Sequence, residues 1–479
     1  MSKYVINEKY ALRSWRDHPR ALAIQNSAHI NPLTPALFKT LLFCDGTYDF
    51  SPDETETDAF RFLTEHRAIR EAADGERLHE WQKFRICDNN RKSVIDLRIT
   101  GRCNLNCPHC FNAKDNNIDR DEWSLEEMDR LIAEAVDCGV SAFTFTGGEP
   151  FCHPHFMEII DRVFKNEMYV DSIKTNGFFI TQEILDRLKS YGHLPRLYIS
   201  FDGIGCHDKI RGVAGLEKRT IDVIRLCVEN GFRVVINAQV NRFTMDSMAA
   251  TAELFDEIGV EALRMIRTTE APRWEQNKKD DCLTQKEYLD FFVDFWAEFG
   301  KKPHTIEILC WRFGEFKTKH KRYHMDACLG EIGDREKGSK CCLSMLREIA
   351  VGPEGKVYVC HPSSGYYDLA GIDLGNVKRD GLRTCINNPR YIEDSGLSSK
   401  DVEEHDEKCR NCEHFRLCHG GCRMMGLLFN MDIRSHDPFM CLYYEGGYEE
   451  KLREVLPDWK NVCTAGQRPD YTKQEGKNS

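Results

Sequence analysis

The sequence predicts an α/β protein built on a parallel sheet, with a small domain before the sheet and a cysteine-rich domain after it. From Val94 onward, apolar strand-like runs alternate with helix-like segments. The predicted strands are 94–99, 142–146, 170–175, 196–201, 233–238 and 261–266. Strands that alternate with helices imply parallel pairing with right-handed crossovers. The ligand sites of such sheets lie at the carboxyl ends of the strands.

Residues 1–85 form the first predicted unit. A helix is predicted from Thr34 to a stop at Asp45-Gly46, because Thr suits the N-cap and the following Pro suits the first turn. A second helix is predicted from Glu54 to His66. The size and order of these elements fit a small winged-helix-like domain. Residues 86–93 are polar and indicate a linker to the sheet.

Helix starts are marked by capping boxes, in which Ser or Thr is followed three residues later by Glu. This pattern predicts helices that begin at Ser124 and Thr284. The second of these helices is rich in aromatic residues and extends to about Phe299. Two further helices are predicted at 155–164 and 181–190.

Length and composition limit the possible functions. A chain of 479 residues suits two or three domains. The net charge of −11 argues against nucleic acid as a partner. We see no signal peptide and no apolar stretch of membrane-spanning length, so we expect a cytoplasmic protein with no membrane partner. The 22 cysteines cluster in short motifs, which favours metal binding over a disulfide framework.

Three cysteines follow the first predicted strand, at Cys103, Cys107 and Cys110. A four-iron cluster needs one outside ligand for each iron, so three thiolates on one loop leave one iron open to a small molecule. The alternative is a zinc site with His109 as the fourth ligand, although that residue adjoins Cys110 and would be strained.

Polar residues end several other predicted strands. Thr146-Gly147-Gly148-Glu149-Pro150 ends the second, where two glycines would let the backbone approach a ligand and its N–H groups bind a polar headgroup. Asn176 follows the third strand, and Ser200, Asp202 and Arg211 follow the fourth. Such residues are also common as structural caps, and Arg211 could equally form a structural ion pair.

The cysteine spacing and the glycine-rich strand end resemble the signature of the radical S-adenosylmethionine (SAM) superfamily. The resemblance implies a partial (β/α)6 barrel over 94–310, in which SAM binds the open iron and is cleaved to a 5′-deoxyadenosyl radical. It also implies that residues 147–149 contact the amino group of SAM and that Ser200 and Asp202 lie near its ribose or near the substrate. Asn176 and Arg211 complete the predicted SAM site.

The second cysteine-rich region resembles the SPASM domain, which we place at 325–450. Its cysteines are Cys342, Cys360, Cys409, Cys412, Cys418, Cys422 and Cys441, with Gly355 ahead of Cys360. The resemblance implies two auxiliary four-iron clusters. One would be held by Cys409, Cys412, Cys418 and Cys441. The other would be held by Cys342, Cys360 and Cys422, with Cys341 or Cys328 as a further candidate. A pair of zinc ribbons is the alternative for these motifs.

Together these features resemble enzymes that mature ribosomally made peptides with SAM and three four-iron clusters. In such enzymes a leading domain, here suggested by the Cys44-Asp45-Gly46 turn, binds the leader of the precursor peptide as an added strand. The expected product is a cross-link. A thioether is the preferred prediction, and a carbon–carbon bond is the second. Flavodoxin or ferredoxin would donate electrons, and no residue is assigned as catalytic base.

Two other functions stay open at this point. A maturase that oxidises Cys or Ser in a sulfatase resembles the same two later domains but usually lacks a long first domain. An iron–sulfur redox sensor without catalysis would not need the glycine-rich SAM loop. The polar tail at 464–479 is predicted to be disordered.

Overall fold

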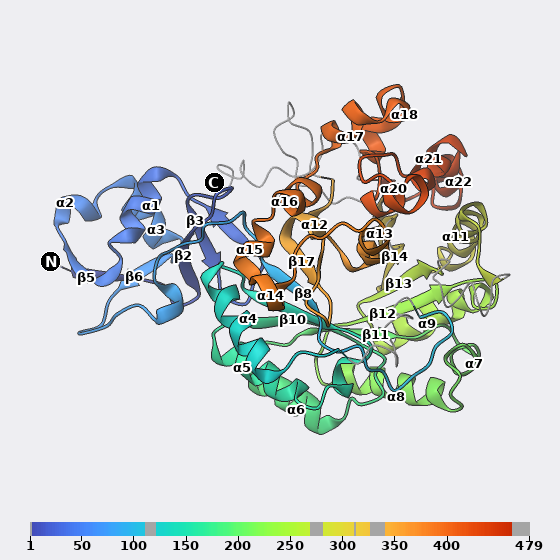
Figure 1. Ribbon diagram of the computed structural model, residues 1–479, viewed down its shortest axis with the longest axis horizontal. Coiled ribbons are helices and arrows are strands. Elements are labelled where there is room, and N and C mark those ends of the chain that lie inside the picture. Colours follow the sequence, from blue (N-terminus) through green and yellow to red (C-terminus); the bar gives the residue numbers. More distant parts are fainter. Residues whose placement is uncertain (1, 111–120, 269–280, 311–312, 326–340, 462–479) are drawn as a thin grey trace.

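The computed structural model of this chain describes residues 2–110, 121–268, 281–310, 313–325 and 341–461. Figure 1 shows a small N-terminal unit at one end, a large twisted sheet with helices along one side, and a C-terminal helical region beside the sheet. The predicted tail at 464–479 lies outside the described residues. The mixed α/β class with an open, partial barrel is therefore confirmed.

The N-terminal unit contains two small sheets. One has the strand order β5-β1-β6 and the other β4-β3-β2-β7. The strands are β1 (Ser2–Ile6), β2 (Tyr10–Ser14), β3 (Ala21–Ile24), β4 (Ile30–Pro32), β5 (Asp45–Phe50), β6 (Ile69–Glu71) and β7 (Arg85–Ile86). Helices α1 (Pro35–Leu42), α2 (Pro52–Thr55) and α3 (Asp58–Glu65) pack beside them.

Side-chain caps set the helix bounds in this unit. Thr34 accepts a hydrogen bond from the backbone N–H of Leu37, so the predicted first helix is confirmed. The predicted helix over 54–66 is instead split in two. Thr57 has extended backbone and caps α3, which interrupts the helix after α2. Phe60 and Leu63 of α3 face the core as their spacing predicts.

The central sheet contains all six predicted strands in sequence order. They are β8 (Val94–Arg98), β9 (Ala142–Thr146), β10 (Tyr169–Thr175), β11 (Arg196–Ser200), β12 (Val234–Val240) and β13 (Ala262–Arg267). Neighbours in this series pair in parallel. Their carboxyl ends therefore meet at one edge of the sheet.

Two further parallel strands extend the series beyond what the sequence predicted. β14 (Glu307–Cys310) pairs with β13, and β17 (Glu348–Val351) pairs with β8 from the other side. The remaining strands are β15 (Gly314–Lys317), β16 (Arg322–His324), β18 (Val357–Tyr358) and β19 (Lys460–Asn461). The sheet stays open, with β18 and β19 at its two edges. The strand β17 brings the cysteine-rich region directly against the first strand of the barrel.

Helices cover one side of this sheet in Figure 1. They are α4 (Leu125–Asp137), α5 (Phe156–Lys165), α6 (Gln182–Ser190), α7 (His207–Arg211), α8 (Leu216–Glu229), α9 (Met248–Ile258) and α11 (Gln285–Phe299). The capping boxes at Ser124 and Thr284 are both formed. Ile95 and Leu97 of β8 are fully buried in the core shared with these helices. Because side chains alternate along a strand, Asp96 and Arg98 face the opposite, inner side of the sheet.

The segment 86–93, which its polar composition indicated as a linker, is largely buried, although Ile86 and Asp88 are exposed. Asn89 is fully buried and donates a hydrogen bond from Nδ2 to the carbonyl of Cys138 at 3.1 Å. The indole N–H of Trp15 donates to the same carbonyl at 3.2 Å. Lys92, only 3% exposed, donates to the carbonyls of Met345 and Leu346 at 3.0 and 2.9 Å. The segment thus joins the N-terminal unit, the barrel and the C-terminal region.

The C-terminal region is built from short helices with turns between them. They are α12 (Leu343–Arg347), α13 (Ser364–Leu369), α14 (Val377–Asp380), α15 (Leu382–Ile386), α16 (Pro389–Ser395), α17 (Ser399–His405), α18 (Glu407–Arg410), α19 (Phe415–Cys418), α20 (Arg423–Asn430), α21 (Pro438–Glu445) and α22 (Tyr448–Val455). Among the described residues, no helix is both long enough and apolar enough to cross a membrane.

Candidate functional site

The loop after β8 brings the three predicted cysteines together. Cys103, Cys107 and Cys110 pack in one small group with Leu105 and Leu216. A turn closes between Cys107 and Cys110, in which the N–H of Cys110 donates to the carbonyl of Cys107 at 3.2 Å. The N–H of Leu105 donates to the sulfur of Cys103 at 3.4 Å. The loop therefore presents three thiols from one end of the first barrel strand.

Arg211 links this loop to the fourth barrel strand. Its Nη1 donates a hydrogen bond to the Sγ of Cys107 at 3.5 Å. Its Nε donates to Asp202 Oδ2 at 2.5 Å. The ion-pair interpretation of Arg211 is thus present in the structure, and it places a positive charge beside the three thiols. Such a charge suits a group of thiolates, which are the form in which cysteine binds iron.

Asp202 is fully buried and receives several partners. Its Oδ1 accepts the backbone N–H of Gln239 at 3.0 Å, and His109 Nε2 lies 3.5 Å from its Oδ2. The backbone N–H of Asp202 donates to His207 Nδ1 at 3.1 Å, so the proton of that imidazole sits on Nε2. Burial lowers the pKa of both His109 and His207 to about 4, so both rings are neutral. Although burial alone would raise the pKa of Asp202, the Arg211 guanidinium outweighs it and holds that pKa below its usual range.

The glycines of the second strand end pack against the cysteine loop. A Cβ on Gly147 would lie 2.4 Å from the carbonyl oxygen of Thr100, and one on Gly148 would lie 2.2 Å from that of Arg102. The N–H groups of Gly148 and Glu149 donate to these two carbonyls at 2.8 Å each. These two N–H groups are therefore used within the protein and not by a ligand, while the contact of residues 147–149 with SAM stays a prediction. Glycine is required here by the approach of a neighbouring loop.

Glu149 ties the second strand end to the third. Its fully buried carboxylate accepts hydrogen bonds from Thr175 Oγ1 and from the N–H of Asn176, both at 2.7 Å. Burial raises the pKa of Glu149 to about 7. Asn176 in turn donates from Nδ2 to Asn104 at 2.8 Å, and the same nitrogen lies 4.0 Å from the sulfur of Cys103.

The predicted site residues are therefore brought together at one edge of the sheet. One chain of contacts runs from Cys103 through Asn176 to Glu149, and another runs from Cys107 through Arg211 to Asp202. Ser200 ends β11 and pairs in register with Asn237 on β12. His109, which the sequence offered only as the fourth ligand of the zinc alternative, and His207 both lie next to Asp202 in this site. The His207-Asp208 pair just after a strand end was the available signal for the second.

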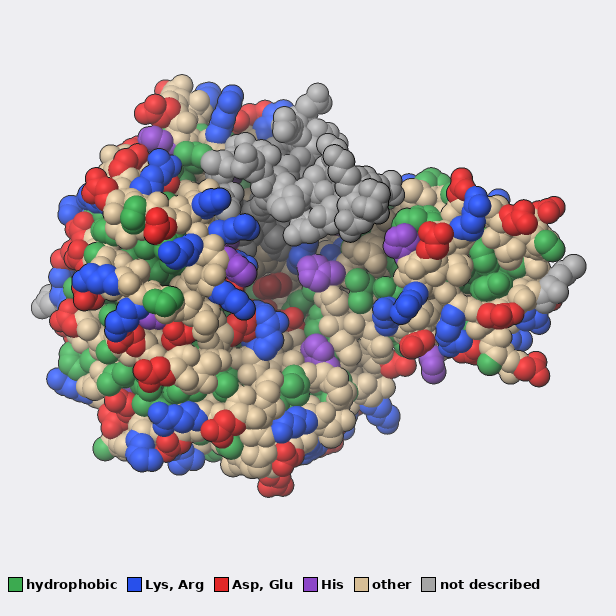
Figure 2. Space-filling view, turned by 180° about the vertical axis from the view of Figure 1, so that it is seen from behind, with side chains coloured by type: hydrophobic (Ala, Val, Ile, Leu, Met, Phe, Trp, Pro, Cys, Tyr) green, Lys and Arg blue, Asp and Glu red, His purple; other side chains and the backbone are tan. Residues whose placement is uncertain are grey.

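Charged side chains also line the inner side of the sheet. Lys174 Nζ lies 2.8 Å from Asp96 Oδ2, and His361 Nε2 donates to the backbone carbonyl of Asp96 at 2.9 Å. Burial and the nearby Asp96 carboxylate raise the pKa of Glu348 to about 7. Figure 2 shows acidic, basic and histidine side chains around a hollow on the face that it displays.

Four of the C-terminal cysteines line one small cavity. These are Cys409, Cys412, Cys418 and Cys441, with Asp437 beside them. The thiols surround the cavity without converging, since in the described part of the chain no three His, Cys, Asp or Glu side chains come together as ligands of a single ion. The structure thus groups the four cysteines that the sequence analysis assigned to one auxiliary cluster.

The cysteines predicted to hold the other auxiliary cluster differ in their surroundings. Burial raises the pKa of the Cys342 thiol to about 12, and electrostatic repulsion from Cys422 adds to the rise. Cys341 is 1% exposed, lies in the main core and donates its N–H to the carbonyl of Leu397 at 2.9 Å. Cys360 follows β18 and caps a short helical turn. Cys328 lies outside the described residues.

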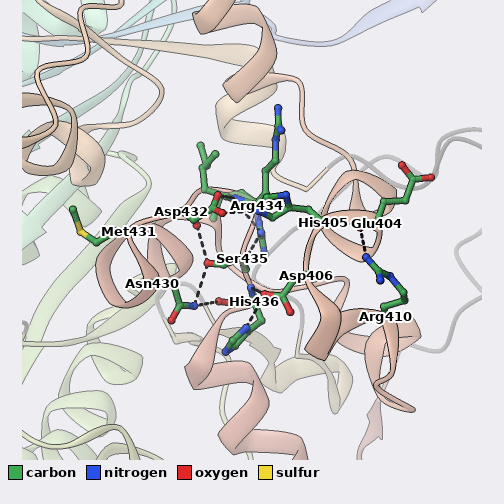
Figure 3. A network of polar contacts seen from close by, with 12 residues as sticks. Glu404, His405, Asp406, Arg410, Asn430, Met431, Asp432, Arg434, Ser435 and His436 are labelled. Carbon is green, nitrogen blue, oxygen red and sulfur yellow. Dashed lines mark hydrogen bonds and ion pairs between the residues drawn. The ribbon is translucent and has the colours of Figure 1, made fainter.

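Polar contacts join the segment that carries Cys409 to the loop before α21, the helix that carries Cys441 (Figure 3). Asp406 caps α18 by accepting the N–H of Cys409 at 3.1 Å, and it also accepts the N–H and the ring Nδ1 of His436 at 2.8 Å each. Asn430 Nδ2 donates to Ser435 Oγ at 3.1 Å. The loop before α21 is thereby fixed to the helix that carries Cys409.

Comparison with known families agrees with this arrangement. Residues 97–255 match the radical SAM superfamily, and residues 341–413 match SPASM, described as an iron–sulfur cluster-binding domain. The first match implies SAM and a four-iron cluster, and the second implies additional iron–sulfur clusters. The three-thiol loop with Arg211 beside it, and the four-thiol cavity, suit such groups.

Individual relatives share most of the chain at low identity. The AdoMet-dependent heme synthase of Methanosarcina barkeri is 26% identical over 75% of this chain and 99% of its own. The PqqA peptide cyclase of Granulibacter bethesdensis is 24% identical over 72% of this chain and 86% of its own.

Solved structures share the fold. Streptococcus suis SuiB bound to S-adenosylmethionine has a TM-score of 0.60 and 14% identity, covering 90% of this chain and 98% of its own. Native anSMEcpe with bound AdoMet and the Cp18Cys peptide has a TM-score of 0.54 and 19% identity, covering 77% of this chain and 98% of its own. This chain is a radical SAM enzyme with a C-terminal SPASM iron–sulfur domain.

Proposed function

We propose that this enzyme modifies a ribosomally made precursor peptide by hydrogen abstraction and cross-link formation. A thioether is the preferred cross-link, and a carbon–carbon bond is the second candidate. Cys103, Cys107 and Cys110 would hold the SAM-binding four-iron cluster, which with SAM supplies the radical chemistry. Arg211 and Asp202 would fix the cysteine loop from the adjacent strand end, and Ser200 would border the SAM site.

Two auxiliary clusters complete the proposal, which brings the total to three. The cavity supports Cys409, Cys412, Cys418 and Cys441 as the ligands of one. The packing of α20, which Cys422 caps, against the short turn that Cys360 caps supports these two cysteines, with Cys342, as ligands of the other. The spacing of Cys342 to Gly355 favours it over the adjacent Cys341 as the ligand.

The observation that carries the peptide proposal is the N-terminal unit. Strands β5 and β6 are the outer strands of one of its sheets, and β4 and β7 are the outer strands of the other. An extended peptide can add to such an edge by main-chain hydrogen bonds. Because buried residues of the connection, Asn89 and Lys92, bind carbonyls of the barrel and of the C-terminal region, a leader bound to the N-terminal unit would sit at a fixed position relative to the site.

Several comparisons support a peptide substrate. SuiB, which has been solved with its precursor peptide SuiA, matches the fold over 91% of this chain. anSMEcpe, solved with the Cp18Cys peptide, matches the fold over 77%, and the sequence of the PqqA peptide cyclase of G. bethesdensis matches over 72%. A redox sensor without catalysis does not account for the radical SAM match. A reducing, cytoplasmic setting and an external donor such as flavodoxin or ferredoxin belong to the same proposal.

The test uses anaerobically reconstituted full-length protein with SAM, a reductant and short cysteine-bearing peptides encoded beside its gene. We expect 5′-deoxyadenosine and a peptide lighter by two hydrogen atoms. A product whose cysteine no longer reacts with a thiol-alkylating reagent would identify a thioether. A product whose cysteine still reacts would identify a carbon–carbon link. An aldehyde in place of Cys or Ser would support the sulfatase-type alternative. Haem formation from a porphyrin, with every peptide unchanged, would contradict the proposal.

A further inference from the structure

Three consecutive residues in the SPASM domain have left-handed backbone. The φ angle is 50° at His419, 83° at Gly420 and 71° at Gly421. Left-handed residues occur singly, because each costs a non-glycine residue about 1–2 kcal/mol. Glycine suits two of the three positions, but a run of this kind persists only when the surrounding structure holds it.

This turn separates two cysteines that differ in their surroundings. Cys418 is the last residue of α19, and Cys422 is the N-cap of α20. The thiol of Cys418 lines the cavity that also contains Cys441, whereas Cys422 is not among the residues that line it. The helix α20, which Cys422 caps, packs instead against the short helical turn that Cys360 caps. In a continuous α-helix, residues four apart would share one face. The left-handed turn is therefore what directs the two thiols to different places.

Arg423 holds the turn from its inner side. The residue is 1% exposed, and its Nη2 donates to the carbonyls of Gly420 and Gly421, the latter at 3.1 Å. Its Nη1 donates to the carbonyls of Ile433 and Ser435 at 3.1 and 2.8 Å. Figure 3 shows the loop that carries Ser435. One guanidinium thus joins the turn to the loop before α21.

Asp437 holds the same turn from the other side. Its N–H donates to the carbonyl of Gly420 at 3.0 Å, and its Oδ2 accepts the N–H of Cys422 at 2.9 Å. A Cβ on Gly421 would lie 2.3 Å from the Cβ of Asp437. Asp437 also caps α21, which carries Cys441. The turn is therefore fixed between two buried, oppositely charged side chains.

We propose that Arg423 is the positioning residue that directs Cys418 and Cys422 to different auxiliary clusters. This inference rests on the proposed function, which supplies those clusters. The planar guanidinium has five donors in a fixed fork and can bind several carbonyls at once. A lysine in the same place keeps the charge but lacks the fork, so it would hold fewer of the carbonyls in place.

The experiment compares Arg423→Gln and Arg423→Lys with wild type in the full-length, anaerobically reconstituted protein. The readouts are iron per chain, the EPR spectrum of the reduced clusters, and 5′-deoxyadenosine formation. Arg13→Gln is the matched control, because Arg13 is also buried and donates to carbonyls, at Leu12 and Lys83 in the N-terminal unit. We expect both Arg423 variants to lose about a third or more of the iron, one cluster in three. The auxiliary EPR signals should change and SAM cleavage per SAM cluster should stay within about twofold.

The outcomes separate this inference from the proposed function. Wild-type iron and wild-type auxiliary spectra in Arg423→Gln would overturn the inference, and full restoration by Arg423→Lys would overturn the role of the fork. Failure of both variants to fold, with Arg13→Gln folded, would also overturn it, because Arg423 would then support the whole core. A wild-type protein without auxiliary iron would instead contradict the proposed function.

Discussion

Arg211 donates a hydrogen bond to the sulfur of Cys107 at 3.5 Å while the buried carboxylate of Asp202 holds its Nε at 2.5 Å. The contact joins the loop after the first barrel strand to the end of the fourth. Hydrogen bonds to cluster sulfurs are among the features that set cluster reduction potentials. The pair therefore connects the stability of the site to its redox chemistry.

Removal of Arg211 should destabilise the folded protein strongly. In Arg211→Gln the fully buried Asp202 would keep only neutral partners, two imidazoles and the N–H of Gln239, and breaking a buried ion pair costs about 3–5 kcal/mol. The measurement is denaturant unfolding of the apoprotein. The control is Arg225→Gln, whose exposed pair with Asp222 at 3.8 Å should contribute less than about 1 kcal/mol. Equal effects of the two substitutions would show that the buried pair contributes nothing special.

The three-cysteine loop should account for one cluster and for SAM cleavage. Cys110→Ala should lower iron by about a third and abolish 5′-deoxyadenosine formation, since a lost thiolate leaves the cluster with two protein ligands. Cys227→Ala is the control, because Cys227 is a fully buried core thiol whose pKa burial raises to about 12. It should keep full iron and activity. Normal SAM cleavage by Cys110→Ala would remove this loop from the account.

Adjacent cysteines at 341 and 342 should behave differently. Cys342→Ala should lose auxiliary iron, because its spacing to Gly355 makes it the proposed ligand. Cys341→Ala should keep its iron and lower the melting temperature, because its side chain is buried in the main core. Iron analysis and thermal unfolding of both variants decide between them. The reverse pattern would make Cys341 the ligand.

Glu149 should make stability depend on pH. Burial raises its pKa to about 7 in the folded protein, against 4.5 for an ordinary glutamate. Its stabilising contribution is therefore full below pH 4.5 and is lost as the pH rises through about 7. Glu149→Gln should flatten the decline in stability of the apoprotein between about pH 5 and 8 by about 2–3 kcal/mol. An unchanged pH profile would mean that Glu149 is ionised throughout this range.

The parts of the fold that could be predicted depend on local sequence. The six barrel strands follow from short apolar runs, and the caps at Ser124 and Thr284 follow from a four-residue pattern. Strand β17 could not be predicted in this way, because it pairs with β8 across more than 200 residues of sequence. Lys92 can be buried because the carbonyls of Met345 and Leu346 accept hydrogen bonds from its ammonium group. These carbonyls are distant in sequence, so the composition of the segment does not reveal the burial.

The candidate site shows the same division. The cysteine groups could be predicted because ligand spacing is written in the chain. The role of Gly148 could not, since only the folded structure brings the carbonyl of Arg102 to its Cα. The role of Arg423 could not be predicted either, because its partners are backbone carbonyls, which every residue type has.

Anaerobic counting of iron and sulfide in reconstituted wild-type protein, with 5′-deoxyadenosine formation assayed in the same sample, is the first test of whether this chain is a three-cluster radical SAM enzyme. We predict about three four-iron clusters per chain and reductive cleavage of SAM. Zinc in place of iron, or a fully loaded protein that leaves SAM intact, would contradict the account.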